Sequence, residues 1–260
     1  MRFVLTAGFD RALHAVALAE LVTRDGHEIA CVLVVDPFRV ARLRAWIRRH
    51  GRAALLRAAR RLAGRPAGAS DARMLAFLAK NAIPQRSLRA WAHARGVAYH
   101  VVGDLNSRRA VELAREGRAQ GALYAGGGIL REEFLASVGG PVLNAHSGPL
   151  PRIRGMHACE WSLLLGETPG VTIHVIDQGI DTGGVIATLP LDIGPGATLE
   201  DLRGQCVELG VIGMRQAIES IRAPLPARAS DAGASRQCFT MAPVLRELTA
   251  GKLAEREEAH

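Results

Sequence analysis

Three polar side chains in the middle of the chain have the types and spacing needed for acyl-transfer chemistry. Asn144 and His146 follow a short apolar run and are two positions apart, so in a strand both side chains leave the same face. Asp181 lies on the loop after a second expected strand, residues 171–176, and that loop could return a carboxylate towards the pair. An amide donor, an imidazole and a carboxylate together could stabilise an oxyanion and accept a proton from an amine. Because no activated serine or cysteine is evident, we expect acyl transfer without a covalent enzyme intermediate.

Simpler interpretations of these residues stay open. Asn144 alone could be a turn residue, and His146 alone could be a satisfied polar residue at a strand end. His146, His157 and His174 could instead hold a metal, with His174 more typical of a packed side chain within a strand. Their separations of eleven and seventeen residues match no short metal-ligand pattern, so we expect no metal.

Alternating strand and helix patterns around these residues predict an α/β fold. Apolar runs typical of strands occur at residues 2–5, 28–35, 97–102, 122–125, 141–143 and 171–176. Helical spacing or capping signals occur at residues 13–21, 71–80, 87–95, 107–119 and 198–221. This order predicts a Rossmann-like three-layer sandwich with a mostly parallel sheet. The first turn, residues 6–10, lacks the GxGxxG fingerprint, which disfavours a nicotinamide oxidoreductase, and we expect Asp10 to cap the first helix.

The residues around the three polar side chains resemble the formyltransferases that use 10-formyltetrahydrofolate. This family includes glycinamide ribonucleotide transformylase, methionyl-tRNA formyltransferase and the amino-sugar N-formyltransferases. The resemblance rests on Asn144-x-His146, Leu150-Pro151, Arg154-Gly155 and Asp181-Thr182-Gly183. It implies a formyltransferase-type fold, in which Asn144, His146 and Asp181 are catalytic.

The same resemblance implies a pterin site and an acceptor site. The pterin of 10-formyltetrahydrofolate is expected to lie against two loops, whose residues are Gly127, Gly128, Ile129, Leu130, Asp177, Gln178, Gly179 and Ile180. The residues expected on the acceptor side are Gly8, Phe9, Arg154, Met156 and His157. The first turn lacks the Gly- and Ser-rich composition that holds the substrate phosphate in the ribonucleotide branch, which disfavours that substrate.

Length and composition indicate a protein with a substantial core and disfavour membrane-spanning and disulfide-rich secreted proteins. A chain of 260 residues that is 48% apolar can bury a substantial core. It has no apolar run of eighteen residues and no signal-peptide pattern, and its four cysteines lack CxxC spacing. We therefore expect a cytoplasmic protein with free thiols and no membrane span. We expect a catalytic domain over residues 1–221, with a helical insertion at about residues 39–92, and a linker with a short extension over residues 222–260.

An arginine-rich segment departs from the family pattern. Residues 39–65 contain ten arginines and no acidic residue, and the net charge of the chain is +8. The segment could be a solvated face of an inserted hairpin, a docking surface for an anionic acceptor, or a membrane-surface helix. Methionyl-tRNA formyltransferases carry a longer C-terminal domain that grips tRNA, so we do not expect initiator tRNA as the acceptor.

Together these observations predict formyl transfer from 10-formyltetrahydrofolate to a primary amine of a small acceptor. An anionic, nucleotide-linked amino sugar is the first acceptor that we expect, and a homodimer is compatible with this prediction. The alternatives are another amine (a small metabolite, a peptide or an aminoacyl group), a formyl-folate hydrolase, and a non-catalytic nucleic-acid-binding module that uses the arginine-rich segment.

Overall fold

The computed structural model describes residues 1–35, 68–221 and 235–258. The arginine-rich segment, residues 39–65, and residues 222–234 of the expected linker lie outside the described residues. The chain forms two compact units, Met1–Val142 and Leu143–His260.

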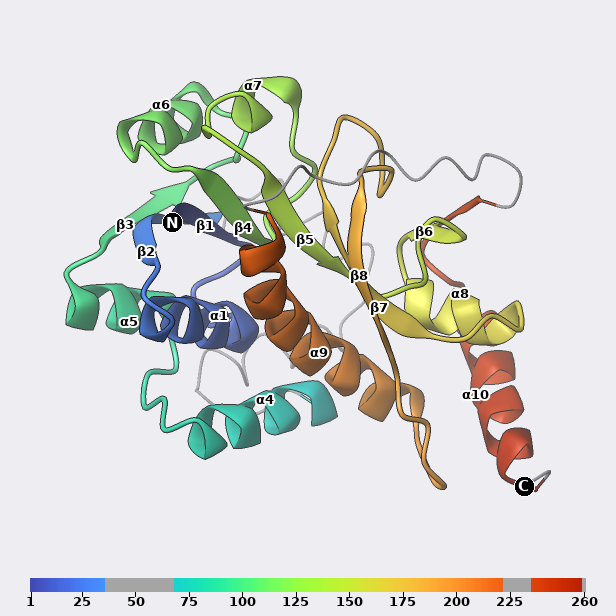
Figure 1. Cartoon of the computed structure of the whole chain (residues 1–260). Coiled ribbons are helices and arrows are strands. Elements are labelled where there is room, and N and C mark those ends of the chain that lie inside the picture. Colours follow the sequence, from blue (N-terminus) through green and yellow to red (C-terminus); the bar gives the residue numbers. More distant parts are fainter. Residues whose placement is uncertain (36–67, 222–234, 259–260) are drawn as a thin grey trace. The chain divides into compact units, whose positions relative to one another are not determined.

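The first unit contains a parallel sheet of four strands (Figure 1). They are β1 (Arg2–Ala7), β2 (Glu28–Val35), β3 (Ala98–Val102) and β4 (Gly121–Ala125). Their order is β3-β2-β1-β4, and every pairing among them is parallel. Strand β1 is buried at every position after Arg2, as expected of a central strand covered on both faces. The predicted parallel α/β core is therefore confirmed in this unit.

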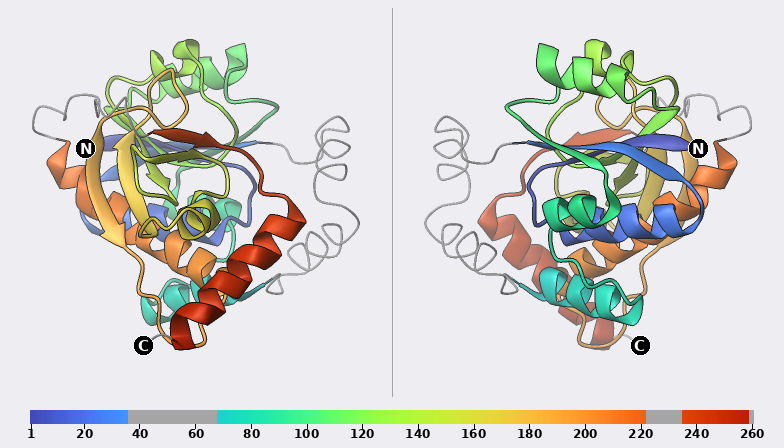
Figure 2. Two further views of the ribbon diagram at one scale, coloured as in Figure 1. Left: turned by 90° about the vertical axis from the view of Figure 1, so that its right-hand side faces the viewer. Right: turned by 90° about the vertical axis from the view of Figure 1, so that its left-hand side faces the viewer.

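Helices cover both faces of this sheet. They are α1 (Leu13–Arg24), α4 (Ala69–Lys80), α5 (Leu88–Arg95), α6 (Arg108–Glu116) and α7 (Glu132–Leu135). Figures 1 and 2 show α1 and α5 on one face, with α4 packed against α1, and α6 and α7 on the opposite face. The sheet and its two helical layers form the predicted three-layer arrangement.

A buried carboxylate ties α1 to α5. Glu20 on α1 is 3% exposed and accepts hydrogen bonds from Trp91 Nε1 at 2.9 Å, Arg24 Nε at 2.8 Å and Arg95 Nη2 at 2.5 Å. Burial alone would raise the pKa of Glu20, but the Trp91 and Arg24 hydrogen bonds and the charge of Arg95 outweigh it and lower that pKa. The charged form of Glu20 is thus the form that the folded first unit stabilises.

The prediction that Asp10 caps the first helix is wrong. The residue at the N-cap of α1 is Ala12, and no side chain makes a capping hydrogen bond there. Asp10 Oδ1 instead accepts from the backbone N–H of Arg89 at 2.9 Å and from the hydroxyl of Tyr99 at 2.9 Å. The carboxylate of Asp10 is therefore bound by the start of α5 and by β3 instead of by the start of α1.

The second unit is built on antiparallel pairings. Strand β5 (Val142–His146) pairs with β7 (Gly170–Val175), and β7 pairs with β8 (Val185–Pro190), all antiparallel. Only residues 176–184 connect β7 to β8, and a connection of this length cannot make the crossover that parallel strands require. Helix α9 (Leu199–Ser220) packs on β7 and β8, and the helix start indicated at residue 198 is confirmed by a capping box between Thr198 and Asp201.

The C-terminal residues are part of the second unit. Strand β9 (Arg236–Cys238) pairs in parallel with β6 (Ile153–Gly155). Helix α10 (Pro243–Glu258) packs against α8 (Ala158–Leu164). Among the described helices, none has the length and apolarity needed to cross a lipid bilayer.

Candidate active site

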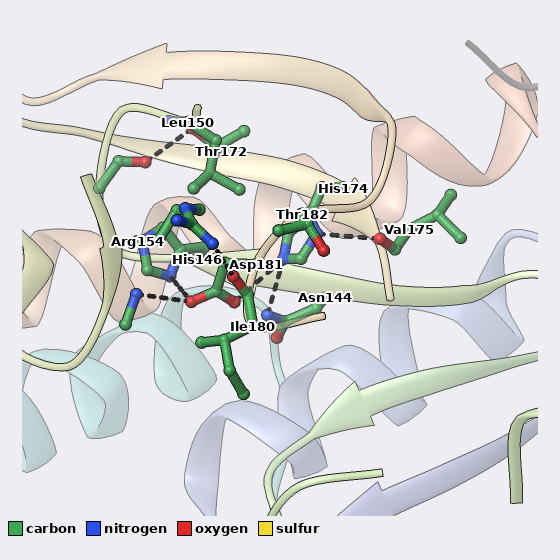
Figure 3. A network of polar contacts seen from close by, with 12 residues as sticks. Asn144, His146, Leu150, Arg154, Thr172, His174, Val175, Ile180, Asp181 and Thr182 are labelled. Carbon is green, nitrogen blue, oxygen red and sulfur yellow. Dashed lines mark hydrogen bonds and ion pairs between the residues drawn. The ribbon is translucent and has the colours of Figure 1, made fainter. Parts of the chain in front are cut away.

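Strand β5 presents the two residues that were predicted from the alternating pattern. In the antiparallel pairing with β7, Asn144 lies opposite His174 and His146 lies opposite Thr172. Asn144 and His146 are two positions apart, so both point to the same face, where Figure 3 shows them beside Asp181. His146 is 6% exposed, whereas Asn144 is only half-buried. Asn144 is therefore the more exposed of the two residues.

The ring of His146 has a defined protonation pattern. Its Nε2 lies 2.8 Å from the carbonyl oxygen of Ile153, and since a carbonyl oxygen can only accept, Nε2 carries a hydrogen. Its Nδ1 lies 3.4 Å from Asp181 Oδ2. A second proton that arrived at Nδ1 would thus be stabilised by a carboxylate. Nδ1 is therefore the ring nitrogen of His146 that faces a carboxylate.

The loop between β7 and β8 returns a carboxylate to this histidine, as the sequence predicted. Asp181 has a φ of 51°, in the left-handed region that only a few side chains adopt. Its Oδ2 accepts a hydrogen bond from the backbone N–H of Gly155 at 2.8 Å, and its Oδ1 lies 3.7 Å from His174 Nε2. One carboxylate therefore faces two imidazoles, and a backbone donor fixes its position.

The rest of the β7–β8 loop is held by its own hydrogen bonds. Asp177 Oδ1 accepts from the backbone N–H of Gly179 at 2.9 Å and from Thr182 Oγ1 at 2.6 Å. Arg154 Nη1 donates to the carbonyl oxygen of Ile180 at 3.2 Å. A Cβ atom at Gly183 would lie 1.8 Å from the carbonyl oxygen of Val175, so only glycine fits there. These contacts fix the turn that contains the expected pterin-binding residues Asp177, Gln178, Gly179 and Ile180.

His174 is the residue of this site that sequence reasoning missed. The sequence pattern indicated a packed side chain, and His174 is indeed 1% exposed. Its Nε2, however, lies 3.0 Å from Asn144 Nδ2, and its Nδ1 lies 3.0 Å from the carbonyl oxygen of Val175. Burial lowers the pKa of His174, against an opposing effect of Asp181. The pairing of His174 with Asn144 follows from the register of β5 and β7, and no local sequence pattern reveals that register.

The expected residues of the first unit lie on two neighbouring loops of that unit. Gly127 and Gly128 have φ values of 130° and 104°, and the hydroxyl of Tyr124 donates to the carbonyl oxygen of Gly128 at 2.8 Å. Ile129 is 70% exposed, whereas Leu130 is buried. That this loop and the β7–β8 loop contact one pterin stays a prediction.

Gly8 and Phe9, the expected acceptor residues of the first unit, lie between β1 and α1. A Cβ atom at Gly8 would come within 3.6 Å of the backbone nitrogen of Gly127, so the two loops approach each other closely. Their contact with an acceptor stays a prediction.

The acceptor-side residues of the second unit surround the backbone donor to Asp181. Arg154 and Met156 flank Gly155, and Met156 is 39% exposed. His157 has a φ of 54°, and its Nδ1 accepts from the backbone N–H of Met241 at 3.2 Å. The three histidines weighed as metal ligands thus all have protein partners. Within residues 1–35, 68–221 and 235–258, no group of three or more metal-binding side chains is placed to hold an ion.

The chain belongs to the formyl transferase family, because the sequence model of that family matches residues 81–218, more than half of the chain. It is similar to the methionyl-tRNA formyltransferase of Anaeromyxobacter dehalogenans, with 33% identity over 146 residues. The match covers 55% of this chain and 46% of that relative. A second methionyl-tRNA formyltransferase, from Sorangium cellulosum, is 29% identical over 136 residues. This match covers 52% of this chain and 43% of the Sorangium protein. The chain therefore spans about half the length of the curated relatives it matches.

Solved structures with the same fold include two kinds of formyltransferase. The sugar 3N-formyl transferase WlaRD, crystallised with dTDP and 5-N-formyl-THF, has a TM-score of 0.56 at 16% identity. That likeness covers 100% of this chain and 81% of WlaRD. Phosphoribosylglycinamide formyltransferase from Bacillus halodurans has a TM-score of 0.57 at 17% identity. That likeness covers 86% of this chain and 96% of the Bacillus protein. The predicted formyltransferase-type α/β fold is confirmed.

Proposed function

We propose that the protein transfers a formyl group from 10-formyltetrahydrofolate to a primary amine. The observation that carries this proposal is the convergence of Asn144, His146 and Asp181 within the second unit of a formyl transferase family member. Asp181 lies 3.4 Å from the ring of His146, and Asn144 points to the same face of β5 as His146. An amide donor, an imidazole and a carboxylate grouped in this way suit formyl transfer to an amine. A nucleophilic side chain is not needed for this chemistry.

In the proposed reaction, the amine attacks the formyl carbon while the carbon–N10 bond of the folate breaks after a tetrahedral intermediate. Asn144 Nδ2 donates a hydrogen bond to the developing oxyanion, and the positive charge of a protonated His146 stabilises that oxyanion. Asp181 Oδ2 stabilises the positive charge on His146 from 3.4 Å. Asp181 also holds a water that takes the amine proton, which ends on N10 of the leaving tetrahydrofolate. The new bond joins the amine nitrogen to the formyl carbon.

For the acceptor, we propose an amino sugar linked to a nucleotide. Support comes from the sugar 3N-formyl transferase WlaRD, whose likeness extends over 100% of this chain. The exposed Met156 beside Gly155, and Arg154 next to it, are the side chains that we propose for contact with this acceptor.

The experiment that tests the folate part is calorimetric titration with 5-formyltetrahydrofolate, a stable analogue of the donor. We expect micromolar binding that is weakened by Gly128→Val, because Gly128 has a φ of 104° that valine adopts only with strain. An exposed change elsewhere in the first unit, Arg109→Ala, is the matched control and is expected to bind as the wild type does. The absence of binding up to millimolar analogue would contradict the proposal.

The acceptor is tested separately by incubating the enzyme and 10-formyltetrahydrofolate with a panel of amines. The panel contains nucleotide-linked amino sugars, the corresponding free amino sugars, glycinamide ribonucleotide and methionyl-tRNA. Formation of an N-formyl sugar nucleotide supports the proposed acceptor, whereas formylation of another amine replaces it. Release of formate at an equal rate without any amine identifies the hydrolase alternative.

A further inference from the structure

His174 is a buried histidine whose two ring nitrogens have different partners (Figure 3). Nδ1 faces the carbonyl oxygen of Val175, and Nε2 faces Nδ2 of Asn144, each at 3.0 Å. Because a carbonyl oxygen can only accept, the single ring proton of neutral His174 must sit on Nδ1. Nε2 then carries a lone pair, and this atom can only accept a hydrogen bond.

This tautomer selects one of the two orientations of the Asn144 amide. Nδ2 must face the ring, because Oδ1 in that place would set two acceptors against each other. The antiparallel register, which places Asn144 opposite His174, holds the two side chains together. One Nδ2 hydrogen is bound to His174, and the second is left for a ligand.

We propose that His174 is a positioning residue of the reaction: its neutral Nδ1–H tautomer fixes the Asn144 amide with Nδ2 as the donor to the formyl oxygen. His174 acts through Asn144 and touches no substrate. The role in catalysis rests on the proposed function, but the tautomer and the amide orientation can be measured without any reaction.

Protonation of His174 would reverse this arrangement. An imidazolium carries a hydrogen on both nitrogens, so Nε2 could no longer accept a hydrogen bond from Asn144 Nδ2. It would instead donate, to Asp181 Oδ1, which lies 3.7 Å away, or to Oδ1 of a turned Asn144 amide, and the amide would lose the contact that fixes Nδ2. Burial lowers the pKa of His174 and keeps the ring neutral. The charged groups that face the ring are Asp181 and Asp177 of the β7–β8 loop, which raise its pKa, and His146 of β5, which lowers it. Turnover is therefore expected to fall as the pH drops through the titration of His174.

Two substitutions separate this role from simple packing. His174→Gln keeps a donor for the Val175 carbonyl and an acceptor for Asn144, whereas His174→Phe fills the space and has neither. We expect His174→Phe to lower kcat about 10-fold, less than the ~10²- to 10³-fold typical of losing an oxyanion donor outright, with little change in KM for the folate. His174→Gln is expected to restore most of the rate and to extend the pH plateau to lower pH, because glutamine does not titrate. Equal rates in the wild type and a folded His174→Phe variant would overturn the proposal.

A nitrogen NMR spectrum of the resting protein tests the proposal independently of activity. The shifts of the two ring nitrogens distinguish the tautomers, and coupling between Asn144 Nδ2 hydrogens and His174 Nε2 reports the hydrogen bond. A protonated Nδ1 and a bare Nε2 that accepts from Asn144 are expected. A proton on Nε2 at neutral pH would overturn the proposal even if formyl transfer were demonstrated. If NMR shows the expected tautomer but the protein transfers no formyl group, the inferred geometry of His174 and Asn144 stands and the proposed function is wrong.

Discussion

Replacing Asp181 by asparagine removes the charge beside His146 while keeping the shape of the side chain. The asparagine oxygen can still accept from the backbone N–H of Gly155, as Asp181 Oδ2 does at 2.8 Å, so the loop should keep its position. At 3.4 Å and an effective dielectric constant of about 20, a carboxylate stabilises an imidazolium by about 5 kcal/mol. Partial solvent exposure of Asp181 reduces this value. Since about 1.4 kcal/mol is one factor of ten, we expect kcat to fall about 10³-fold.

The assay for this prediction follows the release of tetrahydrofolate from 10-formyltetrahydrofolate in the presence of the amine acceptor. Asp192→Asn is the matched control, because Asp192 is an exposed aspartate of the same unit and its loss changes the net charge equally. The control is expected to keep the wild-type rate, and 5-formyltetrahydrofolate should still bind to both variants. An Asp181→Asn enzyme that retains kcat within a factor of three would refute the reasoning.

The other predictions concern the loop, the core and pH. Gly183→Ala puts a methyl group against the Val175 carbonyl oxygen and should displace the β7–β8 loop. We expect kcat for formyl transfer to fall by about 10²-fold, and a titration with 5-formyltetrahydrofolate measures binding of the analogue in the same variant. Glu20→Gln removes a buried charge that Trp91 and two arginines stabilise, and should lower the free energy of unfolding by about 2 kcal/mol in a urea titration. Because the pKa of His174 is lowered in the folded state, the unfolded state binds more protons below about pH 6.5. The free energy of unfolding should therefore fall from about pH 7 to pH 5, and it should fall less in the His174→Gln variant. The same pH dependence of the free energy of unfolding in the two proteins would contradict this prediction.

The grouping of Asn144, His146 and Asp181 was predictable because it depends on local geometry. A period of two places Asn144 and His146 on one face, and a glycine-bounded loop brings Asp181 back to them. The parallel core of the first unit was predictable for a similar reason: strands and helices alternate, and their apolar runs are continuous. In each case the information lies within a short window of sequence.

The features that sequence reasoning missed depend on contacts between distant residues. The hydrogen bond between Asn144 and His174 follows from the register of two antiparallel strands, which no local pattern sets. Strand β9, of only three residues, pairs with β6 across more than eighty residues of sequence and is too short to show periodicity. The predicted boundary between a catalytic domain and an extension at residue 221 stays a prediction.

The most direct test of the account is a transfer experiment with 10-formyltetrahydrofolate carrying a ¹³C label in its formyl group. With a nucleotide-linked amino sugar present, mass spectrometry should find the label on the amine, in an amount equal to the tetrahydrofolate released. The intact enzyme should carry no label, and Asn144→Ala should slow the transfer by about 10²- to 10³-fold. Labelled enzyme, or labelled formate released equally fast without the amine, would contradict the proposed direct formyl transfer.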